Sequence, residues 1–457
     1  MNRKQNTKKV DFAAKRKASA RSESAKQKLS FFQNFFRSSS NNSDSRSGKS
    51  AKPAKFRGKE ENKEDSHHQK RVDPFIVVCV AILVAVGWMM VYSSSFYVAS
   101  QRASTLFAPN NSFHFFIIQG VAIVVGLIAC FVCVKMKFSH LRALALPGLI
   151  IVGMLLIAVL FLNKEINGAR LWIKLGPFSL QPSELAKPLL CLYYGYILSK
   201  DWKSTAENLQ TKLVDYLTQK FLPFALVLVP IMGLVFIGKD LAGAAIIGVI
   251  GVAMYFLSSN SKIHNWFTGL LASGGVLMGV LFAVIEPYRL QRIKTYLGFL
   301  GTGVIEDPLN TGYQLQQTLI AVGTGGILGY GFGQSLQKYF YLQETAFSDT
   351  IFAVYAEEFG LLGSLALITV FLLLFLRGIK IAQAASNKAS ALTAFGLVIW
   401  LFLQTAIHLG VNVGLIPLTG VTLPFMSYGG SAMISSLIGV GLLLNISKQA
   451  KLDYANK

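Results

Sequence analysis

The residues of this sequence that could do chemistry are charged side chains placed inside apolar segments. Glu184 and Lys187 stand three positions apart in the motif PSELAK, so a helix would put them on one face. Glu357 and Glu358 are adjacent in a second apolar segment. Ionisable groups inside a membrane are costly and usually mark a functional site. The alternative is structural: Glu184 and Lys187 could form a self-neutralised pair, and Glu357 could pair with a neighbouring helix.

Two further acids stand where apolar segments begin. Asp349 opens the segment that contains the two glutamates, and Ser348 is expected to cap that helix. Asp240 follows Lys239 in a short break between two apolar runs. Asp349 could simply be a first-turn acid favoured by the helix dipole. Taken together, the acids predict a polar cavity that opens on one side of a membrane.

The strongest candidate for a general base lies in a long polar connection. Glu306 and Asp307 stand in IEDPLNTGYQLQQ, between two apolar segments. A carboxylate beside a membrane-embedded cavity could take a proton from an attacking hydroxyl group. An Asp-Pro step in a loop is more often only a turn, so spacing alone leaves both interpretations open.

The composition requires a membrane to position these residues. The chain has 457 residues, of which 53% are hydrophobic and only 14% are charged, whereas soluble domains carry about a quarter charged residues. The apolar runs are long enough to cross a bilayer as helices, and helices satisfy their own backbone polar groups in lipid. The runs are too continuous for the strands of a membrane barrel.

The fold class predicted is an all-α integral membrane protein with about ten transmembrane helices. A cleavable signal peptide is not expected, because the first 70 or so residues are polar. The predicted spans lie near residues 74–92, 113–134, 143–162, 183–199, 221–237, 241–258, 266–285, 349–376, 391–412 and 427–446.

Loop charge predicts the orientation and the domains. Residues 1–72 hold 20 of the 44 Lys and Arg but only 7 of the 22 Asp and Glu, which predicts a disordered, basic, cytosolic tail. With that tail inside, the inward connections and the C-terminus hold 14 basic residues and the outward connections 9. Basic residues favour the cytosolic side. We therefore expect cytosolic termini, a polytopic domain at 73–447 and a short cytosolic tail at 448–457.

A basic tail that runs into a first span indicates contact with anionic membrane lipids. Nucleic acid is not expected as a partner, because no folded nucleic-acid-binding motif accompanies the charge. The sequence has no His/Cys ligand cluster, so a resident metal is not predicted. One outward connection, residues 286–348, is unusually long, and long loops in compact proteins are usually functional. Its segment Tyr313–Gly333 is apolar but broken by glycines, which predicts a re-entrant or interfacial half-helix.

Four segments together resemble the SEDS family (shape, elongation, division and sporulation proteins), and the resemblance covers roughly residues 74–447. The segments QPSELAK and LPFMSYGGS are its most specific parts. The four are NGARLWIKLGPFSLQPSELAKP (167–188), PYRLQRI (287–293) with EDPLNTGYQLQQTLIAVGTGGILGYGFGQSLQK (306–338), SDTIFAVYAEEFGLLG (348–363) and NVGLIPLTGVTLPFMSYGGSAM (412–433).

The resemblance implies a peptidoglycan glycosyltransferase that polymerises the undecaprenyl-linked precursor lipid II on the outer face of the bacterial cytoplasmic membrane. It implies inverting transfer, with undecaprenyl pyrophosphate leaving, and a single-span penicillin-binding transpeptidase as partner, together with other division proteins. The family's essential acid falls on Asp307. By this resemblance Asp307 would deprotonate the 4-hydroxyl of the acceptor N-acetylglucosamine.

The resemblance also suggests the residues that bind substrate. Cationic groups would stabilise the charge that develops on the leaving pyrophosphate, and a divalent cation, Mg²⁺ or Mn²⁺, could accompany that group. Basic positions of the family's motifs match Arg170, Lys187 and Arg289. The other substrate-binding candidates are Glu184, Asp240, Gln314, Glu344, Asp349 and Ser427.

The sequence departs from the family pattern in two of these places. The usual QPDLGTA reads GKDLAGAA, which keeps the acid as Asp240 but loses Gln-Pro and Thr. The usual LPEAHTDFIF reads LQETAFSDTIF, which keeps Glu344 and Asp349 but has no His. These changes affect details of substrate contact.

The basic tail and the segment TLPF at 422–425 favour the septal branch of the family, so we expect a role in division and a location at the septum. The alternatives are an elongation polymerase, a lipid II flippase or other transporter, and a non-catalytic scaffold of the division machinery. A transporter would be expected to show internal repeats, and no convincing repeat is found in the sequence.

Overall fold

The computed structural model describes most of the chain from residue 72 onward. The described residues are 72–101, 112–162, 170–176, 178–202, 204, 208–259, 261–285, 287–305, 307–310 and 312–450. The predicted tails at 1–72 and 448–457 lie almost wholly outside them, and so do Glu306 and the side chains of Arg289 and Glu344.

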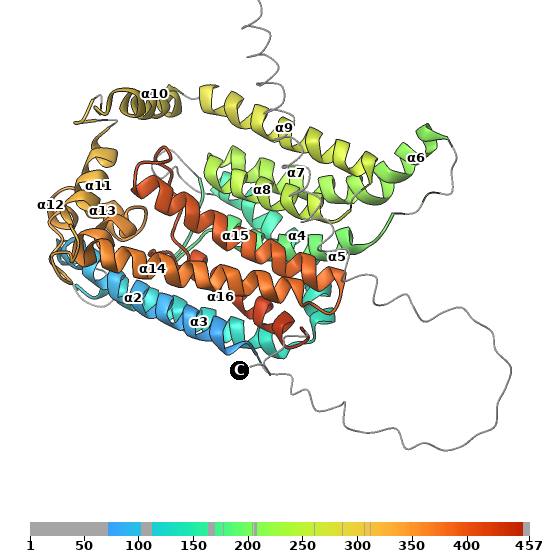
Figure 1. The fold of residues 1–457 in the computed structure, drawn as a ribbon, viewed down its shortest axis with the longest axis horizontal. Helices are drawn as coiled ribbons and strands as arrows, with labels where there is room; N and C mark the ends of the chain where they lie inside the picture. The colour runs from blue at the N-terminus through green and yellow to red at the C-terminus, as the bar shows by residue number, and fades with distance from the viewer. Residues whose placement is uncertain are drawn as a thin grey trace, which may run out of the picture. The chain divides into compact units, whose positions relative to one another are not determined.

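Each of the ten predicted spans coincides with a helix (Figure 1). These helices are α2 (Pro74–Gln101), α3 (His114–Lys135), α4 (Phe138–Leu162), α5 (Pro182–Ser199), α7 (Leu222–Ile237), α8 (Leu241–Leu257), α9 (Lys262–Ile285), α14 (Ile351–Gln383), α15 (Lys388–Asn412) and α16 (Gly430–Ser447). Helix α6 (Leu209–Tyr216) and a π-helical turn, η2 (Leu217–Phe221), lead directly into α7.

Seven helices of the described chain are long and apolar enough to cross a membrane, and α8 is a shorter apolar helix. The multi-pass helical membrane fold is therefore confirmed, while the count of ten spans stays a prediction.

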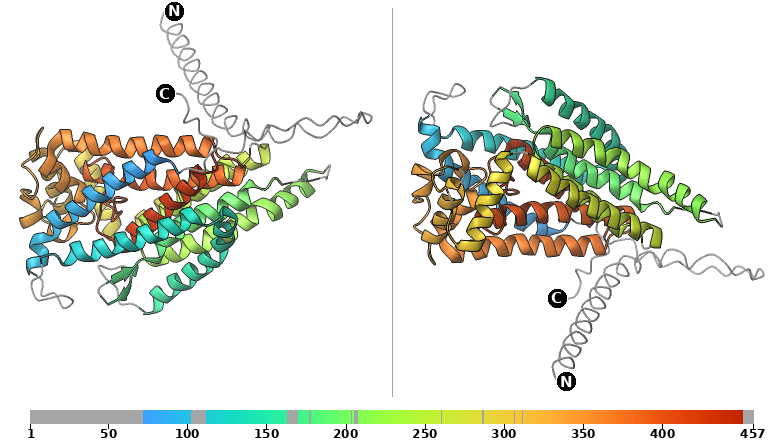
Figure 2. Two further views of the ribbon diagram at one scale, coloured as in Figure 1. Left: turned by 90° about the horizontal axis from the view of Figure 1, so that it is seen from below. Right: turned by 90° about the horizontal axis from the view of Figure 1, so that it is seen from above.

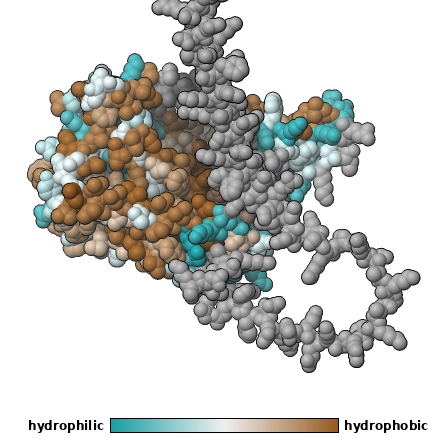
Figure 3. All heavy atoms as spheres, in the orientation of Figure 1, coloured by the Kyte–Doolittle hydropathy of each residue, from teal (hydrophilic) through white to brown (hydrophobic). Residues whose placement is uncertain are grey.

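The helices expose apolar side chains that a soluble protein would bury. Phe161 is 83% exposed, Leu277 69% and Phe131 61%. Figure 3 shows apolar residues over much of the visible helical surface. A continuous apolar surface of this kind needs a non-aqueous neighbour, and lipid provides it.

Small residues let the central helices pack closely. A Cβ atom on Gly441 of α16 would lie 2.7 Å from the carbonyl oxygen of Cys130 on α3. A Cβ atom on Gly195 of α5 would overlap the hydroxyl of Thr393 on α15. Without a hydrophobic drive between helices in lipid, such close backbone approach is a main source of helix association. The pairs α3–α16, α5–α15 and α2–α14 are among the most extensively packed in the bundle.

A short hairpin before α5 was not predicted. Strands β1 (Ile173–Leu175) and β2 (Phe178–Leu180) form an antiparallel hairpin, in which Lys174 pairs with Ser179. Gly176 in the turn has a φ of +64°, a conformation that glycine adopts without strain. The hairpin leads directly into α5 and so fixes where PSELAK begins.

The long connection before α14 is more structured than expected. It contains α10 (Pro287–Thr302), α11 (Tyr313–Thr324), α12 (Gln337–Phe340) and α13 (Gln343–Ala346). The predicted half-helix is α11, at 12 residues too short to cross a bilayer. Helix α10 was not predicted. Figures 1 and 2 show α10–α13 together at one end of the bundle, beside the start of α14.

The prediction that Ser348 caps α14 is wrong. The helix begins at Ile351, its N-cap is Thr350, and that residue makes no side-chain capping bond. Residues 347–350 form turns instead, and Ser348 offers its backbone carbonyl to the hydroxyl of Ser427. This bond ties the end of the long connection before α14 to the loop between α15 and α16.

Candidate active site

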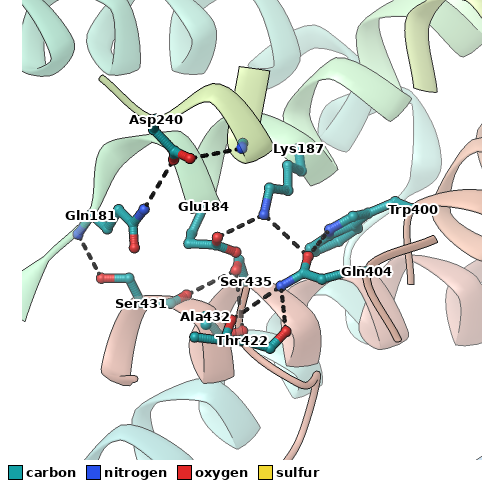
Figure 4. Close-up of polar contacts among 11 residues, drawn as sticks. Gln181, Glu184, Lys187, Asp240, Trp400, Gln404, Thr422, Ser431, Ala432 and Ser435 are labelled. Atoms are coloured by element: carbon teal, nitrogen blue, oxygen red, sulfur yellow. Dashed lines mark hydrogen bonds and ion pairs between the residues drawn. The ribbon is translucent and has the colours of Figure 1, made fainter. Parts of the chain in front are cut away.

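A buried ion pair lies in the centre of the bundle (Figure 4). Lys187 Nζ lies 2.6 Å from Glu184 Oε1, and their side chains are 2% and 8% exposed. The predicted sharing of one helix face is confirmed. Lys187 also donates to Gln404 Oε1 of α15 at 3.1 Å. Glu184 Oε2 is buried with no hydrogen-bond partner among the described residues, so the network has room for one more donor.

Gln404 extends this network toward the loop between α15 and α16. Its oxygen also accepts a bond from Trp400 Nε1 at 2.7 Å, and its nitrogen donates to the carbonyl and hydroxyl oxygens of Thr422 at 3.1 Å each. Sequence reasoning missed these three residues. A glutamine in the middle of an apolar helix was the available signal, because a buried amide needs partners.

Asp240 organises the turn between α7 and α8. Its Oδ1 accepts the N–H of Gly243 at 2.7 Å, so it caps α8, and its Oδ2 accepts a bond from Gln181 at 3.4 Å. Lys239 before it has a φ of 71°, which is uncommon for a residue with a side chain. Burial raises the pKa of Asp240, and the bond from Gly243 opposes that shift.

The N-terminus of α16 meets the same network. The hydroxyl of Ser431 accepts the N–H of Gln181 at 2.8 Å and donates to the carbonyl of Ser179 on β2. Figure 4 shows Glu184, Gln181, Asp240 and Ser431 around one polar region contributed by α5, α8 and α16. The hairpin, the α7–α8 turn and α16 therefore meet at PSELAK.

Ser427 holds the loop before α16 in place. Its hydroxyl accepts the N–H of Leu423 at 2.8 Å and donates to the carbonyl of Ser348 at 2.7 Å. The side chain is buried at 3% exposure, and Phe425 nearby has a φ of 66°. Both bonding functions of the hydroxyl are used within the protein, so Ser427 positions backbone here.

Asp349 lies where this loop meets the start of α14. Asn412 donates to its carbonyl at 3.1 Å, and a Cβ atom on Gly420 would lie 3.6 Å from its carboxylate. Burial raises the pKa of Asp349 to about 6, while the hydroxyl of Ser348 and the charge of Arg292 act in the opposite direction. A carboxyl group with a pKa near 6 can hold or release a proton close to neutral pH.

Asp307 lies on the connection between α10 and α11, and it is exposed. Its carboxylate accepts a bond from Asn310 Nδ2 at 2.9 Å, and its carbonyl accepts the N–H of Gly312 at 3.0 Å. Its φ is 52°, which is uncommon outside glycine and is found more often at functional sites. The turn predicted for Asp-Pro is present, and it leaves the side chain of Asp307 exposed.

The remaining candidates are more scattered. Arg170 is exposed and donates to the carbonyl of Leu160 at 2.9 Å, while its own N–H donates to the carbonyl of Gly238. Gln314 is half-buried in the first turn of α11. Arg289 lies on α10 and Glu344 on α13. The structure thus brings together Glu184, Lys187 and Asp240, and it places Asp349 before α14 and Ser427 on the loop between α15 and α16, which is bonded to Ser348.

The fold and the site define a polytopic membrane protein with a polar region between its helices and acids on the connections at one end. Residues 74–452 match the model of a family described as cell cycle proteins and named for FtsW, RodA and SpoVE. The chain belongs to this family, which confirms the resemblance seen in the sequence.

Similar proteins match most of this chain and nearly all of their own length. A probable peptidoglycan glycosyltransferase FtsW from Geobacter metallireducens is 34% identical, over 84% of this chain and 96% of the relative. Stage V sporulation protein E from Bacillus subtilis is 35% identical, over 83% of this chain and 98% of the relative. A solved structure described as a peptidoglycan synthase complex that coordinates polymerization and crosslinking has a TM-score of 0.63 and 28% identity. That similarity covers 84% of this chain and 99% of the solved one.

Proposed function

We propose that this protein is a peptidoglycan glycosyltransferase that polymerises lipid II on the outer face of the cytoplasmic membrane. The observation that carries the proposal is family membership over residues 74–452 together with an accessible Asp307 in the matching DP–GYQL segment. The names of relatives as peptidoglycan glycosyltransferases and the synthase complex of similar fold support the same activity.

In the proposed reaction Asp307 accepts the proton of the acceptor sugar's 4-hydroxyl. The oxygen attacks the anomeric carbon of the donor, and undecaprenyl pyrophosphate leaves with inversion. A general base of this kind typically contributes a factor of about 10²–10⁴. Arg170 and Arg289 are the cations proposed for the pyrophosphate, since Lys187 is held inside the bundle by Glu184 and Gln404.

The structure suggests separate roles for the other acids. Glu184 and Asp240 organise the polar region between α5, α8 and α16. Asp349, with its raised pKa of about 6, is the alternative acid, and Ser427 bonds to the carbonyl of the residue before it. We propose that these residues shape the substrate region while Asp307 removes the proton.

We propose a single-span penicillin-binding transpeptidase as the partner, supported by the polymerization and crosslinking complex of similar fold. We also propose septal synthesis, with both termini cytosolic, because relatives similar over 84% of this chain are named FtsW and the TLPF segment is present. An elongation polymerase is the closest alternative, since the family includes RodA.

A flippase or other transporter is the second candidate function. The observation that favours it is the buried pair of Glu184 and Lys187, because charged groups inside a helical bundle are common along transport paths. A transporter does not require Asp307, which is exposed on an outer connection.

The experiment is to purify the protein with its cognate transpeptidase, supply lipid II and compare glycan strands. Wild type is expected to make strands and Asp307→Ala none. The matched control is Asp201→Ala, which removes an exposed carboxylate that pairs with Lys388 and should leave polymerisation intact. Equal strands from wild type and Asp307→Ala would exclude Asp307 as the base. If neither wild type nor any variant makes strands, and wild type moves lipid II across vesicle membranes, the protein is a transporter instead.

A further inference from the structure

A second buried ion pair lies well away in sequence from the first and is not used by the proposed reaction. Lys338 Nζ lies 2.5 Å from Glu358 Oε1, and their side chains are 1% and 0% exposed. Ser93 completes the cluster, because its hydroxyl contacts Lys338 Nζ at 2.7 Å and Glu358 Oε1 at 2.6 Å. The cluster joins α2, α12 and α14.

The preceding glutamate holds the same segment by its backbone. Glu357 accepts the N–H of Leu336 at 3.1 Å and the N–H of Gln337 at 3.4 Å, and it also accepts the hydroxyl of Ser335. The consecutive carboxylates of Glu357 and Glu358 thus hold residues 335–338 on α14 by hydrogen bonds. A carboxylate buried at this depth is stable only when donors surround it.

These two carboxylates lie next to a break in α14. Gly360 has φ 64° and ψ −165°, so the helical bonding is interrupted there. The carbonyls of Glu357 and Glu358 accept instead the N–H groups of Tyr330 and Gly331, at 3.0 and 2.8 Å. Buried backbone groups released by a break need such partners.

The bonding across the break runs in both directions. The N–H groups of Leu361 and Leu362 donate to the carbonyls of Gly326 and Ile327, at 2.9 and 3.1 Å. A Cβ atom on Gly360 would lie 2.4 Å from the backbone nitrogen of Gly329. The glycine-rich segment after α11 is therefore laid directly along the broken helix.

The anchored stretch, residues 326–338, lies in the chain between Asp307, which is exposed, and Asp349, which is largely buried. Upstream, α11 packs on α14 and begins one residue after Gly312, whose N–H bonds to the carbonyl of Asp307. Downstream, α13 and a turn lead to Asp349, and α13 packs against α2. Any movement of residues 326–338 relative to α2 and α14 would be passed to both acids.

We propose that Lys338 and Glu358 are positioning residues. Their buried pair fixes the anchored stretch, residues 326–338, on α2 and α14 and so determines the positions of Asp307 and Asp349. The outward segment is the part of the chain from Asp307 to Asp349. The effect on catalysis rests on the proposed glycosyltransferase function, whereas the effect on the outward segment does not. A displacement of about 1 Å in a catalytic group can cost about 100-fold in rate.

A matched control exists at the opposite end of the same two helices. Asp73 Oδ2 accepts a bond from Arg377 Nε at 2.7 Å, and Asp73 also caps the start of α2. This pair joins α2 to α14 as the Lys338 cluster does, but it is at the other end of both helices. Arg377 is 24% exposed and Lys338 1%, so the comparison tests where the link between the two helices acts and not the free energy of each pair.

The test compares Lys338→Met, Glu358→Gln and Arg377→Gln in the complex with its transpeptidase, with Lys338→Arg as the conservative variant. Hydrogen exchange measured by mass spectrometry follows peptides covering 307–325 and 341–352, and lipid II polymerisation is measured in parallel. We expect faster exchange in both peptides for Lys338→Met and Glu358→Gln. Turnover should fall about 10- to 100-fold with KM nearly unchanged. Lys338→Arg should show slower exchange and higher turnover than Lys338→Met.

Arg377→Gln is expected to speed exchange near the start of α2 and to leave the outward peptides and turnover unchanged. The proposal is overturned if the outward peptides exchange alike in wild type and Lys338→Met, or if Arg377→Gln lowers turnover equally. If wild type makes no glycan but the exchange pattern is as expected, the proposed function fails while the anchoring of the outward segment stands.

Discussion

Removal of the lysine from the central ion pair should be strongly destabilising. Lys187→Met leaves the carboxylate of Glu184 buried, with one oxygen already unpaired and the other deprived of its partner. At the 2.6 Å separation of Lys187 and Glu184 the gross attraction is about 6 kcal/mol for an effective dielectric constant near 20. Breaking a buried pair from one side costs about 3–5 kcal/mol net, because the remaining charge is uncompensated.

The double variant separates the charge from the packing. Glu184→Leu with Lys187→Met removes both charges and keeps similar volumes, so its stability should lie within about 2 kcal/mol of wild type. Gln404 then loses one donor but keeps its bond from Trp400 and its bonds to Thr422.

The assay is thermal denaturation of the detergent-solubilised complex. The quantity measured is the fraction of the complex that stays monodisperse after heating. The single variants Lys187→Met and Glu184→Gln should lose stability and the double variant should regain it. The reasoning is refuted if Lys187→Met is as stable as wild type, since the pair would then contribute nothing. Polymerisation by a stable double variant would further show that the pair is structural, and its loss would place the charges in substrate handling.

Three further outcomes are expected. Gly360→Ala should destabilise the protein by about 1–3 kcal/mol, since Gly360 has a φ of 64° and no room for a Cβ atom; an unchanged melting curve would contradict this. Burial raises the folded-state pKa of Asp349 to about 6, so the folded state holds the proton longer than the unfolded one. Stability should therefore fall as pH rises from about 4 to 6. Asp349→Asn should remove that dependence and melt higher than wild type at pH 8, with no difference at pH 4. Chelation with EDTA should slow polymerisation if Mg²⁺ or Mn²⁺ accompanies the pyrophosphate, and addition of either cation should restore the rate.

Local features of the sequence were sufficient to predict most helices. Apolar length located the ten helical segments, and the basic tail and loops gave a consistent direction of insertion. The pairing of Glu184 with Lys187 was predictable too, because residues three apart meet on any helix. Helix α10 was missed because its mixed composition carries no hydropathy signal, and the hairpin at 173–180 was missed because its strands are only three residues long.

Contacts between distant parts of the chain were not predictable. Lys338 and Glu358 were both visible in the sequence, and Glu358 was noted as a buried acid, but nothing local joins it to Lys338 or to Ser93. Ser348 was a reasonable helix cap by type, yet the backbone turns and the bond from Ser427 moved the start of α14 to Ile351.

The sequence by itself therefore determined the membrane fold, the family and the acids available for chemistry, because hydropathy, charge and motif are properties of neighbouring residues. Tertiary structure decided which acids are buried and which are accessible. Glu358 is enclosed by partners from α2 and α12, and Glu184 pairs with Lys187, which bonds to Gln404 of α15, whereas Asp307 is left exposed on a turn. Burial and pairing depend on how helices pack, and packing brings together residues that lie hundreds of positions apart.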